Sequence, residues 1–359
     1  MKGTTNLSKS ATTIIRTPYY IFFYTCLLIL LFAAIVIGVS FGSVHIPLQH
    51  VVVIIYSELF DQPIAAEIDV NLRNIIMQIR LPRVLLASLV GASLALAGGA
   101  FQGLLRNPLA DPYTLGISSG ASVGAVMTIF FGITFPFIGS FTLPLVSILC
   151  AFFTMLIVIF FARLLDKSLR VETIILTGII FSSFLGAVIS LMIALTGEEL
   201  RQIIGWLLGS VSMRGWSYIV TLLPFFVIGT LILMAQANEL NVMSFGEEHA
   251  QHIGVSVQQR KLIIMIAGSI LTGAAVAVSG TIGFVGLVIP HFVRLLIGPN
   301  HLHLLPASLF VGASFLIIAD LIARTIISPV ELPIGVITAL IGAPVFALIL
   351  MRQHMKGKN

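Results

Sequence analysis

Long apolar runs separated by short polar connections dominate this sequence. There are ten of them, at about residues 21–42, 84–104, 115–135, 142–163, 173–196, 217–236, 262–282, 283–297, 305–325 and 334–351. About 20 apolar residues in an α-helix cross the ~30 Å hydrocarbon core of a bilayer, because each residue adds about 1.5 Å. The 359 residues are 58% hydrophobic and only 9% charged, which excludes an ordinary soluble enzyme. The sequence therefore predicts an all-α polytopic membrane protein of about ten transmembrane helices, forming one domain over residues 1–359.

The distribution of Lys and Arg predicts the orientation of these helices. Ten crossings put both termini on one side of the membrane, and that side would hold 13 of the 19 Lys and Arg residues. These are Lys2, Lys9, Arg16, Arg106, Arg163, Lys167, Arg170, Arg260, Lys261, Arg294, Arg352, Lys356 and Lys358. Cytoplasmic loops carry an excess of such residues, so we expect both termini in the cytoplasm. The net charge of +5 then reflects topology, and we predict no nucleic-acid partner.

A signal peptide is an alternative for the first apolar run, which follows Lys2, Lys9 and Arg16. The apolar core of a signal peptide has about 7–15 residues and precedes a cleavage site of small residues. The run over 21–42 is longer than this, so we interpret it as an uncleaved first helix.

Two connections are long enough to hold structure of their own. Residues 43–79 would be external and carry apolar residues at near-helical spacing, so we expect an amphipathic helix followed by a linker. Residues 237–261 would be cytoplasmic. Glycine readily adopts the positive φ that a break between helices needs, and we predict two short helices here, broken at Gly246 and Gly254.

Signatures of catalysis and of metal binding are absent from the sequence. It contains no GxxxxGK[ST], HExxH, CxxC or GxSxG motif. The closest histidine pairs, His249 with His252 and His301 with His303, lack carboxylate or cysteine ligands at convincing spacing, so we interpret them as solvated or capping residues. We therefore predict no catalytic residue, no metal site and no cofactor in this chain, which would not hydrolyse ATP itself.

Charges and glycines inside the apolar runs favour packing over ion transport. Asp320 lies inside a run and Arg324 follows it at i+4, so we interpret the two as a structural ion pair. Ion-driven carriers usually hold functional charges in the hydrocarbon, which disfavours a gradient-driven secondary transporter. Gly116, Gly120 and Gly124 recur every four residues, and we interpret them as a close helix crossing.

Several longer motifs carry a resemblance to a known family. They are RLPRVLLASLVGASLALAGGAFQGLLRNPLADPYTLGISSGAS (80–122), WLLGS (206–210), SFGEEHAQHIGVSV (244–257), GTIGFVGLVIPHFVRLLIG (280–298) and ADLIARTIISPVELPIGVITALIGAP (319–344). From about Gly42 to Arg352 the chain resembles the permease family of type II ABC importers, which move iron–siderophores, haem and cobalamin. The first motif and the last two are long and specific enough to exclude a chance match.

The resemblance implies an assembly in the cytoplasmic membrane of a bacterium. It implies ten helices, a second permease subunit that is a copy or a paralogue, two copies of a cytoplasmic ABC ATPase and one external binding protein. ATP and Mg would be bound by the ATPase. We expect an iron(III)–siderophore as substrate, with haem or cobalamin as alternatives, because the binding protein chiefly sets ligand identity in this family. A structural scaffold would not need both an external docking site and an internal docking loop.

In this family, the arginines that match Arg80, Arg83 and Arg324 dock onto acidic residues on the two lobes of the binding protein. The predicted topology places all three on the outer face, where guanidinium groups can offer paired hydrogen bonds to carboxylates. The alternative is that they only anchor helix ends at the membrane surface.

The resemblance also implies two sites on the cytoplasmic side. The family's coupling helices, which enter a cleft of the ATPase, correspond to 237–261, and the matching residues are Gly246, Glu247, Glu248, Ala250 and Gly254. Small residues at 250 and 254 suit insertion between protein surfaces, and a solvated loop is the alternative. The family's cytoplasmic gate corresponds to Asn107, Pro108 and Leu109, in a segment where proline prevents a continuous helix.

Overall fold

The computed structural model describes residues 5–42, 46–61 and 69–356, and this part of the chain is helical without a strand. The α-helices are α1 (Thr5–Ser40), α2 (Leu48–Leu59), α3 (Val70–Asn74), α4 (Leu81–Leu104), α5 (Ile117–Phe130), α6 (Thr142–Leu165), α7 (Val171–Leu195), α8 (Leu200–Leu207), α9 (Gly215–Ala235), α10 (Ala237–Met243), α11 (Glu247–His252), α12 (Val257–Ser279), α13 (Val285–Ile297), α14 (His301–Thr325) and α15 (Ile334–Lys356). A π-helical segment, η1 (Ile75–Arg80), joins α3 to α4, and two 3-10 turns are η2 (Pro112–Leu115) and η3 (Gly139–Phe141).

Each of the ten predicted apolar runs contains a helix, which confirms the all-α polytopic fold. Seven of these helices, α1, α4, α6, α7, α9, α12 and α14, are long and apolar enough to cross a membrane. The other three, α5, α13 and the apolar part of α15, are shorter. The 14 residues of α5 reach about 21 Å at 1.5 Å per residue, which is less than the ~30 Å core.

The run at 115–135 is shorter as a helix than predicted because its first residues form a turn. Gly116 has a φ of +83°, in the left-handed region that favours glycine, and it separates η2 from α5. At the other end the helix stops at Phe130.

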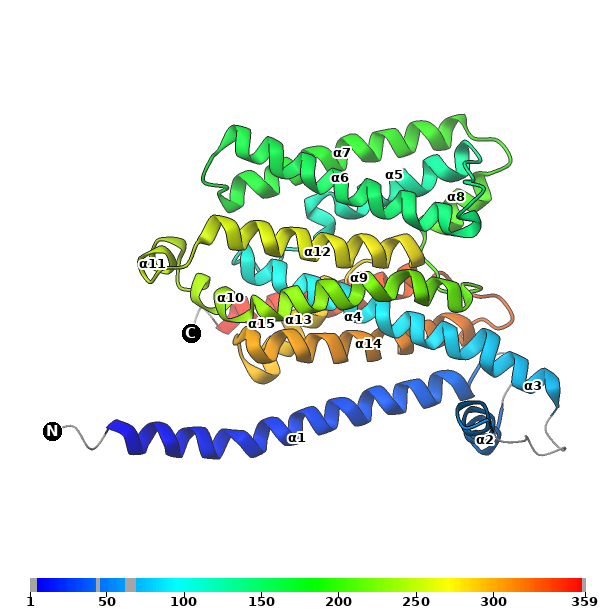
Figure 1. Cartoon of the computed structure of the whole chain (residues 1–359), viewed down its shortest axis with the longest axis horizontal. Helices are drawn as coiled ribbons and strands as arrows, with labels where there is room; N and C mark the ends of the chain where they lie inside the picture. The colour runs from blue at the N-terminus through cyan, green and yellow to red at the C-terminus, as the bar shows by residue number, and fades with distance from the viewer. Residues whose placement is uncertain (1–4, 43–45, 62–68, 357–359) are drawn as a thin grey trace.

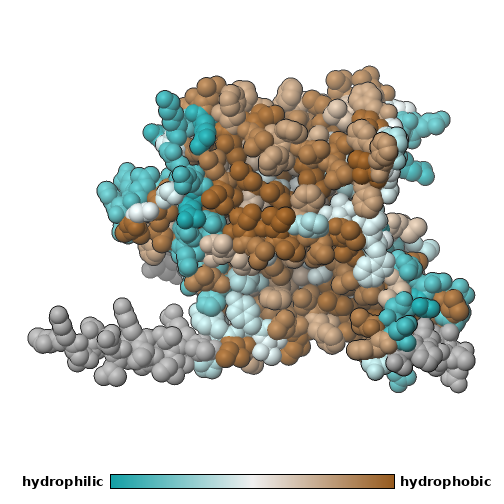
Figure 2. All heavy atoms as spheres, viewed as in Figure 1, coloured by the Kyte–Doolittle hydropathy of each residue, from teal (hydrophilic) through white to brown (hydrophobic). Residues whose placement is uncertain are grey.

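The spanning helices run roughly along one direction with α4 among them (Figure 1). Helices α9, α12, α13 and α14 pack against α4, and α1 packs on the outside of α14. Both ends of the described chain lie at the end of the bundle that carries α10 and α11, which we call the α11 end (Figure 1). The opposite end carries α2 and α3, and we call it the α2 end. Apolar side chains cover most of the visible face between the two ends, where polar side chains gather (Figure 2).

Glycines set the closest approaches between helices. A Cβ added at Gly91 would overlap the carbonyl oxygen of Gly312 in α14, and one at Gly98 would overlap the backbone of Gly286 in α13. In a membrane, van der Waals contact between such surfaces drives helix association. The packing role predicted for the α5 stripe is confirmed at Gly120, where a Cβ would overlap Thr154 of α6.

Candidate functional site

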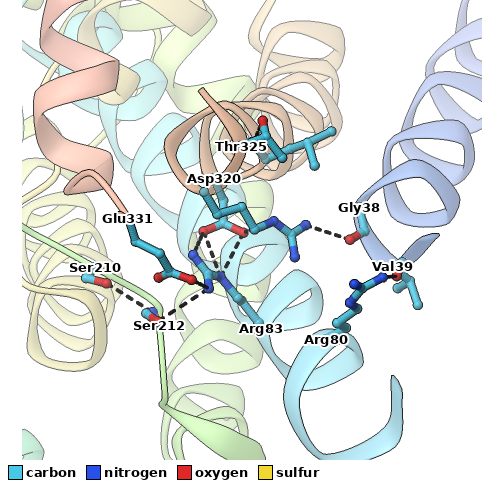
Figure 3. A network of polar contacts seen from close by, with 11 residues as sticks. Gly38, Val39, Arg80, Arg83, Ser210, Ser212, Asp320, Thr325 and Glu331 are labelled. Carbon is cyan, nitrogen blue, oxygen red and sulfur yellow. Dashed lines mark hydrogen bonds and ion pairs between the residues drawn. The ribbon is translucent and has the colours of Figure 1, made fainter. Parts of the chain in front are cut away.

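The three arginines predicted to dock the binding protein lie where α4 begins and α14 ends, at the α2 end (Figure 1). Figure 3 shows Arg80 and Arg83 in this region. Arg80 closes η1 and Arg83 lies in the first turn of α4, whereas Arg324 lies in the last turn of α14. Helices α4 and α14 are packed against each other along their length, starting from the close contact of Gly91 with Gly312. This crossing brings Arg83 into one cluster with Asp320, which is 237 positions away in the sequence.

Arg83 is the centre of this cluster. Its Nε donates to both carboxylate oxygens of Asp320, at 3.0 and 3.1 Å, and its Nη2 lies 2.9 Å from Oδ1. Its Nη1 donates to Glu331 at 2.8 Å and to Ser212 at 3.3 Å. The Asp320 side chain is 1% exposed, whereas that of Glu331 is 43% exposed. Arg83 therefore has one buried acidic partner and one accessible one (Figure 3).

The predicted ion pair between Asp320 and Arg324 exists, but it is not the main contact of Asp320. The Arg324 Nε lies 3.6 Å from the carboxylate, farther than any of the Arg83 contacts. Asp320 is closer to Arg83 because α4 places the Arg83 guanidinium within hydrogen-bonding distance of both carboxylate oxygens. Sequence spacing within α14 could not reveal this partner, because it lies on another helix. Breaking a buried pair by removing one partner costs about 3–5 kcal/mol.

Arg80 and Arg324 also hold the end of α1. Arg80 Nη1 donates to the carbonyl oxygens of Val39 at 2.9 Å and Ser40 at 2.7 Å, and Arg324 Nη2 donates to that of Gly38 at 2.5 Å. The last carbonyl groups of a helix have no partner within it and carry partial negative charge, so guanidinium groups stabilise them. Sequence reasoning missed this contact, because nothing in the local sequence of α1 indicates it.

All three arginines are buried, which differs from the open placement that we expected on the outer face. Their exposures are 4% for Arg80, 7% for Arg83 and 6% for Arg324. The carbonyl groups of α1 and the carboxylates of Asp320 and Glu331 replace water around them. A carboxylate from another protein could reach Arg83 by taking the place of Glu331, the accessible partner.

The predicted break of 237–261 into two short helices is confirmed at the α11 end. Gly246, with φ of +120°, precedes α11, and Gly254, with φ of +92°, follows it. Ala250 is fully buried within this chain, so it does not belong to a surface that enters a partner. The exposed side chains beside α11 include Phe245, at 79%, and Ile253, at 58%. Sequence reasoning missed these two apolar residues.

Lys261 holds α11 in place. This lysine in the first turns of α12 is 1% exposed, and its Nζ lies 2.6 Å from a carboxylate oxygen of Glu247. The same Nζ donates to the carbonyl oxygen of Leu169, between α6 and α7, at 2.8 Å. Lys261 therefore connects α12 both to α11 and to the segment between α6 and α7. Glu248, the neighbour of Glu247, is exposed.

The segment predicted as a gate forms tight turns after α4. Asn107 Oδ1 accepts a hydrogen bond from the backbone N–H of Leu109 at 2.9 Å, and Asp111 begins η2 by accepting one from that of Tyr113 at 3.0 Å. The helix ends before Pro108, as predicted, and Leu109 is exposed. Arg106 lines a depression of about 480 Å³ together with residues 245–249, so this segment lies beside α11.

The WLLGS motif joins three elements. Ser210 N–H donates to the carbonyl oxygen of Ser279 in α12 at 2.7 Å, and Ile334 N–H at the start of α15 donates to that of Gly209 at 3.0 Å. Thr281 donates its hydroxyl to the carbonyl oxygen of Leu207. Beside this junction lies a depression of about 520 Å³ whose lining residues carry no charge: Tyr113, Leu207, Leu208, Thr281, Gly283, Gly335, Val336, Ala339 and Leu340.

Known proteins resemble this chain over most of its length. The uncharacterised ABC transporter permease protein YvrB of Bacillus subtilis is 62% identical over 326 residues, which are 91% of this chain and 92% of that protein. The cobalamin import system permease protein BtuC of Halobacterium salinarum is 41% identical over 289 residues, 79% of this chain and 74% of that protein. Further relatives are named as permeases for molybdate, hemin and iron(III) citrate.

A solved structure agrees with the fold. It is described as a metal-chelate type ABC transporter in an inward-facing conformation, and it matches with a TM-score of 0.78 at 36% identity, over 91% of this chain and 98% of that chain. The FecCD transport family matches residues 28–352. This chain therefore belongs to the FecCD transport family and is the permease subunit of an ABC importer.

Proposed function

We propose that this chain forms the translocation pathway for an iron(III)–siderophore complex in the cell membrane of a bacterium. The observation that carries this proposal is the 36% identical structure described as a metal-chelate type transporter, which matches 91% of the chain. The uncharged depression beside the WLLGS motif supports it, because a bulky chelate that hides the charge of its metal could pass an uncharged surface. Haem and cobalamin are the alternatives, since relatives are named for both.

Uptake into vesicles tests this proposal. The chain would be reconstituted with its ATPase in liposomes containing ATP and Mg, and its binding protein would be added outside. We expect ATP-dependent uptake of radioactive iron as ferric siderophore, with little uptake of labelled cobalamin or hemin. If only cobalamin or hemin is taken up, the proposed substrate is wrong, but the chain still belongs to the same family.

We further propose that two copies of a cytoplasmic ABC ATPase and a second permease, identical or paralogous, complete the transporter. The ATPases would bind ATP and Mg, for which this sequence has no phosphate-binding motif. Phe245, Ile253 and Gly254 are exposed around α11, so the ATPase would contact these residues, and Glu248 with them. Asn107, Pro108 and Leu109, beside α11, would form the cytoplasmic gate.

The external binding protein would dock at the α2 end by exchange of carboxylates. Arg83 has its donors occupied by Asp320, Glu331 and Ser212. A carboxylate on the binding protein would displace Glu331, whose side chain is half exposed, while Asp320 keeps Arg83 in position. Arg80 and Arg324 would add positive charge beside it, although both also hold α1.

This docking model has a matched test at Glu331. Glu331→Gln should raise the affinity of the binding protein several-fold at low salt, because the internal competitor is weakened. Glu199→Gln, an exposed carboxylate at the same end, controls for the general loss of negative charge. Arg83→Gln should lower affinity and abolish the effect of Glu331→Gln. If Arg83→Gln binds like the unmodified chain, Arg83 is not a docking residue.

A gradient-driven carrier is the alternative from another class, and Asp320 argues against it. A proton or sodium site needs a carboxylate that can exchange its cation. Asp320 is fixed by three contacts from Arg83. Uptake driven by an ion gradient without ATP would contradict the ATP-driven proposal.

A further inference from the structure

One face of α2 is apolar and largely exposed in the part of the chain that the structure describes. The opposite face, with Val51, Ile54 and Ser57, is buried, and α2 packs on α1 and η1. The exposed face carries four large side chains that are 50–74% exposed, namely Leu48, Val52, Tyr56 and Leu59. At 3.6 residues per turn, these four form a stripe on the side away from Val51 and Ile54. Apolar stripes of this kind mark an interaction surface.

The orientation of α2 limits what this stripe can contact. Figure 1 shows α2 along its own axis, whereas the spanning helices run across the view. The helix therefore lies crosswise to the spanning helices, which is parallel to the membrane plane. It lies beside the last turns of α1, at the edge of the bundle. Its exposed stripe therefore lies on the side away from α1 and η1, at the level where the spanning helices end (Figure 1).

The stripe continues the lipid-facing surface of α1. In an 18-residue apolar window of α1, 17% of the residues are buried. Large apolar side chains are exposed toward the end of the helix, including Phe32 and Ile37, and Phe41 directly after it. Because α1 contacts α2, the apolar surface passes from one helix to the other. On the other side, Glu58 of α2 pairs with Arg73 of α3 at 2.6 Å, which fixes α2 to the protein.

We propose that α2 is an interfacial helix that inserts its apolar stripe into the lipid surface at the α2 end. Interfacial helices lie in the plane of the membrane with their apolar side at the boundary between headgroups and acyl chains. Tyr56 suits this depth, because amphipathic aromatic rings are enriched there. The lipid contact of α2 would help to position the end of α1, against which α2 packs. Arg80 and Arg324 donate hydrogen bonds to the last carbonyl groups of α1. Insertion of α2 into the lipid surface requires only that the chain spans a membrane, whichever substrate the transporter carries.

Collision rates of spin labels test the proposal. The full chain, with Cys26 and Cys150 changed to Ala, would be reconstituted in phosphatidylcholine vesicles and labelled at Val52→Cys. Phe32→Cys on α1 is the control for lipid contact and Glu199→Cys the control for water contact. We expect the label at Val52 to collide with oxygen as at Phe32, and to collide several-fold less with an aqueous nickel chelate than the label at Glu199. Leu59→Cys, also in the stripe, repeats the measurement.

Three results would overturn the proposal. Nickel collisions at Val52 equal to those at Glu199 would place the stripe in water. Protection that arises only when the binding protein is added would make α2 part of the docking surface. Dipolar broadening between labels at Val52 would show that a second copy of the chain covers the stripe.

Discussion

Asp320 pairs with both Arg83 and Arg324 at the α2 end. It is the buried carboxylate between two buried guanidinium groups, those of Arg83 and Arg324. Glu331 also contacts Arg83, but water reaches its side chain. The two acids therefore differ in burial, since the Asp320 side chain is 1% exposed and that of Glu331 is 43% exposed.

Replacing these acids should have unequal effects on stability. Asp320→Asn removes the buried carboxylate of Arg324 and leaves Arg83 with only the half-exposed Glu331. It should lower the free energy of unfolding by about 3–5 kcal/mol. Glu331→Gln removes a half-exposed contact and should cost about 0–1 kcal/mol. Denaturant unfolding in detergent measures both. Equal losses would mean that burial does not separate the two acids.

Acid should remove the contribution of Glu331. Burial raises the pKa of Glu331, but hydrogen bonds from Arg83 and Ser212 and the charges of Arg83 and Arg324 lower it, and the net shift is downward. A lowered pKa means that the ionised carboxylate stabilises the folded chain above the unfolded pKa of about 4.3, and that this stabilisation is lost as the pH falls through the folded value. The stability difference between the unmodified chain and Glu331→Gln should shrink from pH 7 to about pH 3. A difference that is constant with pH would contradict the Arg83 contact.

Lys261 should decide how firmly α11 is held. Lys261→Met removes the contacts to Glu247 and to Leu169, and we expect faster hydrogen exchange over Glu247–His252. Lys167→Met changes an exposed lysine at the same end and serves as the control. If exchange in α11 is the same in both variants, other contacts position the helix.

At the scale of elements, two glycines with positive φ, Gly246 and Gly254, flank the short helix α11. Gly254→Trp should abolish transport while the chain still assembles in the membrane. Among the described residues, the two chain neighbours aside, nothing lies within 4 Å of a Cβ at Gly254, so the added side chain starts in open space, where a partner would meet it. The positive φ of this residue strains any other residue by about 1–2 kcal/mol. Gly254→Ala has the same strain without the bulk and should retain transport. Full transport by Gly254→Trp would contradict the assignment of α11 as the ATPase contact.

Hydropathy and glycine spacing predicted which segments form helices. They did not predict which side chains contact each other between helices. Ten apolar runs became ten helices because burial in lipid demands long apolar segments. The turn at Gly116 shortened α5, since a single glycine can break a helix without changing hydropathy. The side of α11 that contains Ala250 was predicted as a partner surface and is buried in this chain. Whether a small residue faces its own chain or a partner depends on packing that local sequence does not contain.

The cluster around Arg83 shows the same limit at the α2 end. The motifs identified Arg80, Arg83 and Arg324 as a set, but not their burial or their contacts with α1. Arg83 and Asp320 are 237 residues apart, and no local pattern relates such positions. The role of these arginines in docking stays a prediction.

At the scale of the whole molecule, the arrangement agrees with the even number of crossings. Both ends of the described chain lie at the α11 end (Figure 1). Helix α6 ends there and α7 and α12 begin there, which places Arg163, Arg170 and Arg260 at that end. These three members of the predicted cytoplasmic set therefore lie at the α11 end of the bundle. The positive-inside rule predicts that this end faces the cytoplasm.

Labelling of single cysteines with a membrane-impermeant maleimide tests which end of the bundle faces the cytoplasm. Cys26 and Cys150 lie in α1 and α6 and would be changed to Ala. We expect Ser244→Cys, an exposed position between α10 and α11, to react only in inside-out vesicles. Glu199→Cys, exposed between α7 and α8 at the α2 end, should react only in right-side-out vesicles. Vesicles opened with detergent control for reactivity. Reversed labelling would put the Arg83 cluster inside and α11 outside, where no ATPase is present, and both partner assignments would fall together.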